Sequence, residues 1–202
     1  HDQIIEDVTN SLGYASVLAI PIFFGAAAMS ESLLVTVFGA QYSGIGAVLV
    51  GLALYRLLSM QSSQLASTVS GLDRPDILTR IGLVALVLNI SLGYVFLLEY
   101  GTAGVVLATI ISEVVRYGAL ARVIKARLPE LSLFTQPFRQ QLLAGVMMFV
   151  VVDRLHAFLG VSWWGELVAL VGVGAVVYFI VLIAISESFR VTIRGILDDA
   201  AA

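Results

Sequence analysis

Long uncharged apolar runs alternate with short polar breaks along the chain. Only helices or closed barrels satisfy the backbone in lipid, and these runs lack the two-residue alternation of barrel strands. A helix needs about 20 apolar residues to cross the hydrocarbon core of a bilayer. We predict six helices, at 12–38, 45–70, 77–98, 102–125, 140–158 and 164–185. The expected fold class is therefore all-α, a polytopic membrane helical bundle of about six transmembrane helices.

Composition agrees with a membrane protein. The chain is 59% hydrophobic and 12% charged, whereas an ordinary soluble domain is about 45–50% apolar and about 25% charged. A net charge of −3 argues against a nucleic-acid partner, and the absence of cysteine excludes disulfides and thiolate sites. The chain begins with His1 and has no basic segment ahead of a short apolar core, so we expect no signal peptide and a portion of a longer protein.

Basic residues predict the direction of the bundle. They form three groups: Arg74 and Arg80; Arg122, Lys125, Arg127 and Arg139; and Arg190 and Arg194. These groups fall on one side if all six helices span, and the opposite connections at 39–44, 99–101 and 159–163 hold no Lys or Arg, though Arg154 lies near the last. By the positive-inside rule, the basic side and both ends of the chain are cytoplasmic, in a multi-pass cell-membrane protein.

A polar stripe on the second helix is the main candidate site. At 100° per residue, Arg56, Ser59, Ser63 and Ser67 fall within one narrow arc. Arg56 is about 16 Å into the helix, near the middle of the hydrocarbon layer, where a lipid-facing arginine is costly. The stripe therefore lines a water-filled cavity in which Arg56 suits phosphate binding, or Arg56 forms a structural ion pair with a carboxylate on another helix.

Other candidates are fewer. Glu113 and Arg116 are three residues apart on the fourth helix, which predicts a local ion pair; alternatively, Glu113 is a cavity carboxylate that pairs with Arg56 or binds a coupling cation or proton. Pro21 and Gly25 form a hinge or a static kink in the first helix. We expect no metal site, no cofactor and no catalytic motif, so the chain is not expected to be an enzyme.

Two small-residue faces favour close packing. Asn89 shares an arc with Gly82, Ala85 and Gly93 on the third helix, and Gly104 and Ala108 lie together on the fourth. Small residues at such spacings let neighbouring membrane helices approach closely. We therefore interpret both faces as helix contacts rather than substrate contacts.

Three segments together resemble a known family. They are LAIPIFFGAAAMSESLLVTVFGAQYSGIGAVL (18–49), SGLDRPDILTR (70–80) and VLNISLGYVFLLEYGTAGVVLATIIS (87–112). Their motifs resemble the Ile-Pro span with its Phe-Gly-x-x-Tyr turn, the Gly-x-x-Arg-Pro turn and the Tyr-Gly-x-x-Gly turn of polysaccharide (O-antigen-type) flippases. These belong to the multidrug, oligosaccharidyl-lipid and polysaccharide exporter superfamily. The resemblance covers roughly residues 10–125, and residues 126–202 match only in hydropathy.

The resemblance implies a two-lobed transporter of about fourteen helices that works by alternating access. Such flippases move a polyprenyl-phosphate-linked oligosaccharide across the cytoplasmic membrane for cell-envelope polysaccharide biosynthesis. This chain would be the C-terminal portion, with four spans in 1–125, a cytoplasmic linker at 126–139, and two spans with a short tail in 140–202. Its partners would be the lipid-linked substrate, membrane lipids and the N-terminal lobe, with possible coupling to a Na⁺ or H⁺ gradient.

Two other functions remain open. A cation-coupled multidrug exporter of the same superfamily would prefer an acidic cavity, and a midplane arginine counts against it. A non-transporting membrane scaffold of an envelope-assembly complex would bury the serine stripe against other helices and hold Arg56 in a dry ion pair.

Overall fold

The computed structural model is helical throughout the residues that it describes, which are 16–71, 75–129, 135–160, 163–187 and 189–190. Its elements are α2 (Ala19–Phe38), a 3₁₀ turn η1 (Ala40–Tyr42), α3 (Gly46–Gly71), α4 (Pro75–Lys125), α5 (Gln136–Leu159) and α6 (Trp164–Ile185). No strand occurs in these ranges, so the all-α prediction is confirmed. Arg74, Arg194, both chain ends and the middle of the predicted 126–139 linker lie outside the described residues.

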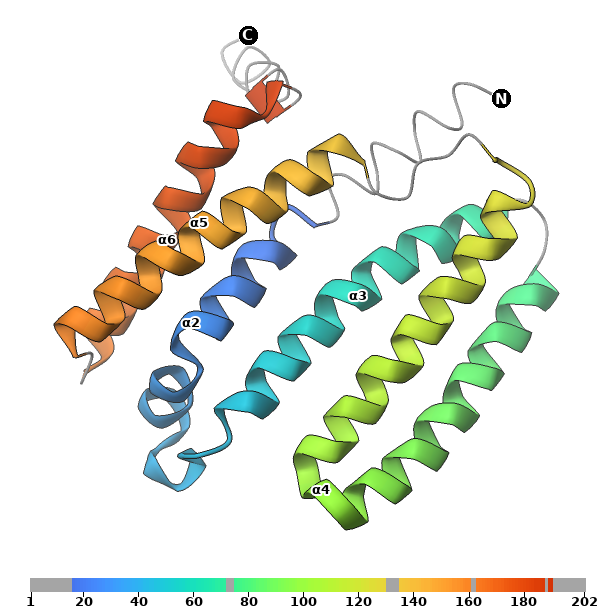
Figure 1. The fold of residues 1–202 in the computed structure, drawn as a ribbon, viewed down its shortest axis with the longest axis horizontal. Coiled ribbons are helices and arrows are strands. Elements are labelled where there is room, and N and C mark those ends of the chain that lie inside the picture. The colour runs from blue at the N-terminus through green and yellow to red at the C-terminus, as the bar shows by residue number, and fades with distance from the viewer. Residues whose placement is uncertain (1–15, 72–74, 130–134, 161–162, 188, 191–202) are drawn as a thin grey trace, which may run out of the picture.

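The long helix α4 is a hairpin of two antiparallel arms (Figure 1). The chain reverses at Gly101, whose φ of 61° and ψ of −144° belong to a region that glycine alone adopts readily. Asn89 Nδ2 on the first arm donates to Thr109 Oγ1 on the second at 3.1 Å. The tight connection predicted at 99–101 is therefore present, and it joins the two predicted helices 77–98 and 102–125.

The irregular point of α2 is Met29, whose φ of −139° and ψ of 29° are not helical. It directly precedes three polar residues, Ser30, Glu31 and Ser32. Beyond it, Ser32 Oγ and His156 Nε2 lie 2.7 Å apart and tie α2 to α5. Pro21 lies in the first turn of α2, where a missing N–H costs no helical hydrogen bond. A hinge at Pro21 and Gly25 stays a prediction.

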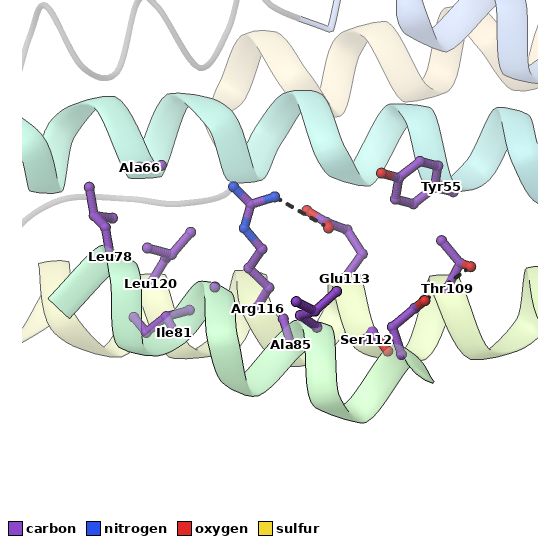
Figure 2. Close-up of a pocket in the computed structure, with 13 residues that line it drawn as sticks. Tyr55, Ala66, Leu78, Ile81, Ala85, Thr109, Ser112, Glu113, Arg116 and Leu120 are labelled. Carbon is purple, nitrogen blue, oxygen red and sulfur yellow. Dashed lines mark hydrogen bonds and ion pairs between the residues drawn. The ribbon is translucent and has the colours of Figure 1, made fainter. Parts of the chain in front are cut away.

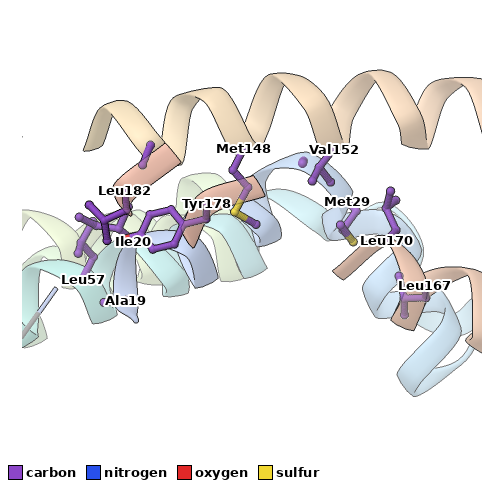
Figure 3. Close-up of a cluster of buried hydrophobic side chains, with 12 residues drawn as sticks. Ala19, Ile20, Met29, Leu57, Met148, Val152, Leu167, Leu170, Tyr178 and Leu182 are labelled. Carbon is purple, nitrogen blue, oxygen red and sulfur yellow. The ribbon is translucent and has the colours of Figure 1, made fainter. Parts of the chain in front are cut away.

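The helices pack in a fixed order. α3 lies between α2 and α4, and α2 also contacts α5 and α6. One apolar core joins α2, α5 and α6 around the buried side chains of Ile20, Met148 and Tyr178 (Figure 3). A second core joins α3 to the second arm of α4 through Leu65 and Leu120.

Four helices, α2, α4, α5 and α6, are long and apolar enough to cross a membrane. Large apolar side chains such as Leu83, Ile90 and Ile180 are more than half exposed on their outer faces. Such surfaces suit lipid rather than water, which agrees with a multi-pass membrane protein. α3, with its arginine, glutamines and serines, is not among the four. The predicted count of about six spans therefore stays a prediction.

The helix ends separate into two groups (Figure 1). The C-terminal ends of α2 and α5 and the turn at Gly101 lie at one end of the bundle. The C-terminal ends of α3, α4 and α6 lie at the other end, together with Arg80, Arg122 and Lys125 of α4, whereas Arg154 lies near the C-terminal end of α5. This separation agrees with the predicted alternation of basic and uncharged connections. Which end is cytoplasmic stays a prediction.

The two small-residue faces of α4 differ. Gly104 and Ala108 are buried, and a Cβ added at Gly104 would meet the backbone carbonyl oxygen of Phe96 on the other arm. Gly82 and Gly93, in contrast, have open space where a Cβ would lie. Close packing is therefore found at Gly104, whereas the face that carries Asn89 borders a pocket.

We expect Gly104→Ala to lower the free energy of unfolding by about 1–3 kcal/mol, because backbone at Phe96 must move to admit the methyl group. Gly118→Ala in the same helix is the matched control, since an added Cβ there meets no atom within 4 Å. This control should be neutral or gain up to about 1 kcal/mol from helix propensity. Unfolding of the full-length protein in detergent measures the stability of both variants. Equal stability of Gly104→Ala and Gly118→Ala would contradict the close approach of Gly104 to the backbone of Phe96.

Candidate functional site

The predicted polar stripe lies on an uncovered face of α3. Leu57, Leu65 and Val69 are buried in the two cores, and this leaves the opposite side of the helix free. Arg56 is exposed there and makes no ion pair or hydrogen bond with any described residue. Ser59 is half-buried, and the other two serines of the stripe are exposed. The described helices therefore leave the whole stripe accessible.

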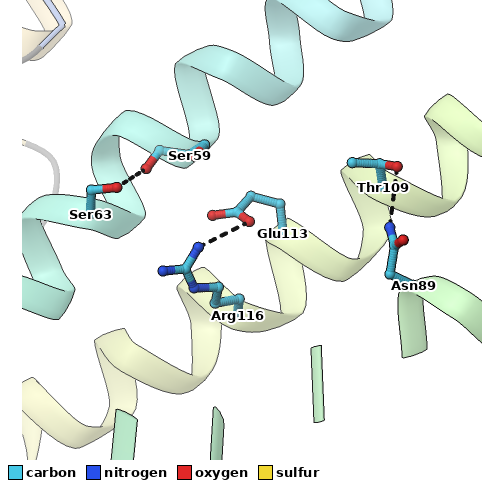
Figure 4. Close-up of polar contacts among 6 residues, drawn as sticks. All are labelled: Ser59, Ser63, Asn89, Thr109, Glu113 and Arg116. Carbon is cyan, nitrogen blue, oxygen red and sulfur yellow. Dashed lines mark hydrogen bonds and ion pairs between the residues drawn. The ribbon is translucent and has the colours of Figure 1, made fainter. Parts of the chain in front are cut away.

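The serine hydroxyls are bonded to their own helix. Ser63 Oγ donates to the carbonyl oxygen of Ser59 at 2.8 Å (Figure 4). Ser67 Oγ donates to the carbonyl oxygen of Ser63 at 3.0 Å. This satisfies the hydroxyl protons within α3 itself. The oxygens still offer lone pairs outward, so the stripe can accept hydrogen bonds while Arg56 donates them.

A pocket of about 470 Å³ lies on a different face, between α3 and the two arms of α4 (Figure 2). Its polar lining residues come from three helical segments: Tyr55 on α3; Asn89 on the first arm; and Thr109, Ser112, Glu113 and Arg116 on the second arm. Neither Arg56 nor the serines of the stripe line it. The candidate residues therefore separate into two sites.

The carboxylate of this pocket is paired with its neighbour on the same helix. Arg116 Nη1 lies 3.5 Å from Glu113 Oε2, and the side chains are 32% and 7% exposed. Glu113 Oε1 is buried without a hydrogen-bond partner among the described residues. Figures 2 and 4 show both side chains on the second arm of α4, with the dashed contact between them. The pair that the spacing predicted is present, and no pair joins Glu113 to Arg56.

Asn89 joins the two arms of α4 through Thr109, as a packing face would, and both residues also line the pocket. Thr109 accepts from Asn89 and donates to the carbonyl oxygen of Val105 at 2.9 Å. The signal was available in the sequence, because both residues are equally distant from Glu99, beside the predicted turn. Two polar residues at equal distances from the turn of a helical hairpin lie opposite each other on its two arms, where their side chains can form a hydrogen bond.

The predicted hinge residues, Pro21 and Gly25, lie away from the polar pocket and the stripe. Pro21 and Gly25 border an apolar pocket of about 530 Å³ that α2 forms with α5 and α6. Within the described ranges, no three residues of the types His, Asp, Glu or Cys are grouped closely enough to hold a metal ion.

Comparisons with known proteins give two relatives and no wider match. No protein-family model and no solved structure matches the chain. It is 28% identical to the probable flippase AglR of Haloferax volcanii over 96% of this chain and 41% of the relative. It is 29% identical to the probable low-salt glycan biosynthesis flippase Agl15 of the same organism, over 54% of this chain and 23% of the relative. The chain thus spans about two-fifths of AglR and a quarter of Agl15.

The first of these matches extends past residue 125, so the expectation that residues 126–202 resemble the family only in hydropathy was too narrow. Over nearly its whole length, this chain is similar to a probable flippase, which confirms the resemblance to polysaccharide flippases predicted from its motifs.

Proposed function

We propose that this chain is the C-terminal portion of a flippase that moves a polyprenyl-phosphate-linked oligosaccharide across the cytoplasmic membrane by alternating access. The protein would serve cell-surface polysaccharide or glycan biosynthesis as a transporter, not as an enzyme. The similarity to two probable flippases and the membrane helical bundle support this proposal. The single observation that carries it is the exposed, unpaired Arg56 on α3.

Arg56 suits the phosphate of such a substrate. It lies about 15 Å along α3 at 1.5 Å per residue, a depth at which a cation needs water or an anion. A guanidinium binds phosphate oxygens through two parallel hydrogen bonds and stays charged at any physiological pH. No described carboxylate neutralises it. A lipid-linked phosphate or pyrophosphate would supply the missing counter-charge during transport.

The serine stripe suits the glycan. Ser63 and Ser67 already donate to the helix backbone, so their oxygens present acceptors to a ligand. Phosphate oxygens bring no proton to such acceptors, whereas sugar hydroxyls do. The stripe runs from Arg56 to the end of α3 at which the basic residues gather. We place the sugar along Ser59, Ser63 and Ser67 and the phosphate at Arg56.

An N-terminal lobe would face the stripe. In this proposal, residues 1–125 supply the four spans of the C-terminal lobe, 126–139 are a cytoplasmic linker, and 140–202 add two spans and a cytoplasmic tail. The transport cavity then lies between α3 and the N-terminal lobe, and both ends of this chain are cytoplasmic. The uncovered face of α3 supports this arrangement, because a polar stripe left to lipid would be unstable.

Glu113 is the carboxylate that we propose for coupling to a Na⁺ or H⁺ gradient. It is buried, it borders a pocket rather than packed apolar side chains, and one of its oxygens has no described partner. Arg116 competes for it through a single 3.5 Å contact. A bound cation or proton would therefore weaken the pair.

The other two functions fit less well. A multidrug exporter would present acidic groups to its cavity, whereas the uncovered face of α3 presents Arg56. A scaffold would pack the stripe against other helices and seal Arg56 in an ion pair, and neither feature is found among the described residues.

Transport by the full-length protein tests the proposal. Reconstituted in liposomes, it is expected to move a polyprenyl-pyrophosphate oligosaccharide between leaflets, as measured by accessibility of the glycan to an external lectin. A lipophilic cationic dye in the same liposomes tests drug export. Movement of the dye without movement of the oligosaccharide would favour the multidrug exporter, and movement of neither would favour the scaffold.

A further inference from the structure

A second, smaller pocket opens between the two arms of α4. It measures about 190 Å³ and is lined by Arg80, Ile81 and Val84 from the first arm and by Val115, Arg116 and Ala119 from the second. We call this pocket the α4 groove. It combines two arginines with four apolar side chains, and no acidic residue lines it. A ligand that fits it needs both negative charge and hydrocarbon.

The charges of the groove are only partly compensated. Arg80 is exposed and forms no ion pair with a described residue, although Asp76 lies one helical turn before it. Arg116 contacts Glu113 only through Nη1, at 3.5 Å. A guanidinium has five N–H donors, so most donors of both arginines are free. The two side chains together can therefore bind the oxygens of one phosphate.

The groove also lies toward the basic end of the bundle. Arg80 is about 7 Å from the start of α4, and Arg116 is about 13 Å from its end, at 1.5 Å per residue. Both helix ends lie at the basic end of the bundle. Long cationic side chains near helix ends reach toward the membrane interface. Next to the groove, Leu83, Val84 and Val114 are more than half exposed, as expected for side chains in contact with acyl chains.

We propose that the α4 groove binds an anionic membrane phospholipid, with its headgroup phosphate between Arg80 and Arg116 and an acyl chain along Val84 and Val115. Basic pockets between membrane helices are typical sites for anionic headgroups. Free phosphate would use the arginines but not the apolar walls, so the lipid is the better occupant. The site is separate from the polar stripe, since none of Arg56, Ser59, Ser63 and Ser67 borders it. A bound lipid would also draw Arg116 away from Glu113.

Lipid binding to the full-length protein tests the proposal. Native mass spectrometry of the detergent-solubilised protein would be titrated with phosphatidylglycerol, with phosphatidylcholine of the same acyl chains, and with inorganic phosphate. We expect phosphatidylglycerol to bind in preference to the other two. Arg80→Gln should weaken the binding of phosphatidylglycerol about fivefold, because it removes the attraction of one cation near an anionic headgroup. Val84→Trp, which fills the apolar part of the groove, should weaken it independently of charge.

Arg122→Gln is the matched control, because Arg122 is exposed on the same helix but does not line the groove. It should change binding less than twofold. Equal loss in Arg122→Gln and Arg80→Gln would mean only a diffuse attraction to the basic end and would overturn the site. Unchanged binding in Arg80→Gln, or equal binding of both lipids, would overturn it as well. Full competition by inorganic phosphate would show that the groove binds free anions instead.

Discussion

Arg56→Ala is expected to reduce transport of the lipid-linked oligosaccharide roughly 10- to 100-fold, the cost of about 1.5–3 kcal/mol for hydrogen bonds to a charged group. The fold should be preserved, because Arg56 is exposed and contacts no described polar group. Transport by the full-length protein in liposomes gives the rate, and unfolding in detergent gives the stability.

Graded variants separate charge from geometry at this position. Arg56→Lys keeps the cation but loses the planar fork, so it should transport at a rate between those of wild type and Arg56→Ala. Arg122→Ala is the control for a general loss of positive charge, since Arg122 is exposed on another helix, and it should transport normally. Wild-type transport by Arg56→Ala would make the arginine structural and remove our substrate site. The similarity to flippases would survive that result.

Hydropathy predicted most of the helices because lipid imposes a minimum length and forbids unpaired backbone. The run at 164–185 coincides with α6, and 45–70 differs from α3 by one residue at each end. α5 begins four residues before the predicted 140, because Thr135 Oγ1 accepts from the N–H of Phe138 and Pro137 sits in the first turn. This capping signal was present in the sequence, but the polarity of the segment concealed it.

The candidate sites were harder to predict, because they depend on how the helices pack. The arc through Arg56 and the serines follows from helical geometry alone, and the structure leaves that arc accessible. Whether Glu113 meets Arg56 or Arg116 depends on the rotation of α4 against α3, which hydropathy does not specify. The kink at Met29 likewise lacks the usual signal, since the proline of α2 lies at Pro21. Tertiary contacts decide both.

The pair between the buried Glu113 and the partly exposed Arg116 gives the largest expected change in stability. Arg116→Ala should lower the free energy of unfolding by about 3 kcal/mol, because it leaves the carboxylate of Glu113 buried without its partner. Glu113→Gln/Arg116→Ala removes the charge together with its partner and should be clearly more stable than Arg116→Ala. Unfolding of the full-length variants in mixed micelles measures the free energy of each, in a double-mutant cycle with Glu113→Gln.

The order of the variants' free energies of unfolding shows whether Arg116 or another group is the main partner of the Glu113 carboxylate. If Arg116 is the principal partner of Glu113, the double variant recovers most of the stability that Arg116→Ala loses. Glu113 Oε1 has no described partner that could take over this role. A loss below about 1 kcal/mol in Arg116→Ala, the range of exposed pairs, would mean that the 3.5 Å contact is a surface pair of little energetic weight. Glu113 would then be neutralised by a group outside the described residues, and its proposed coupling role would have to be assigned with that group.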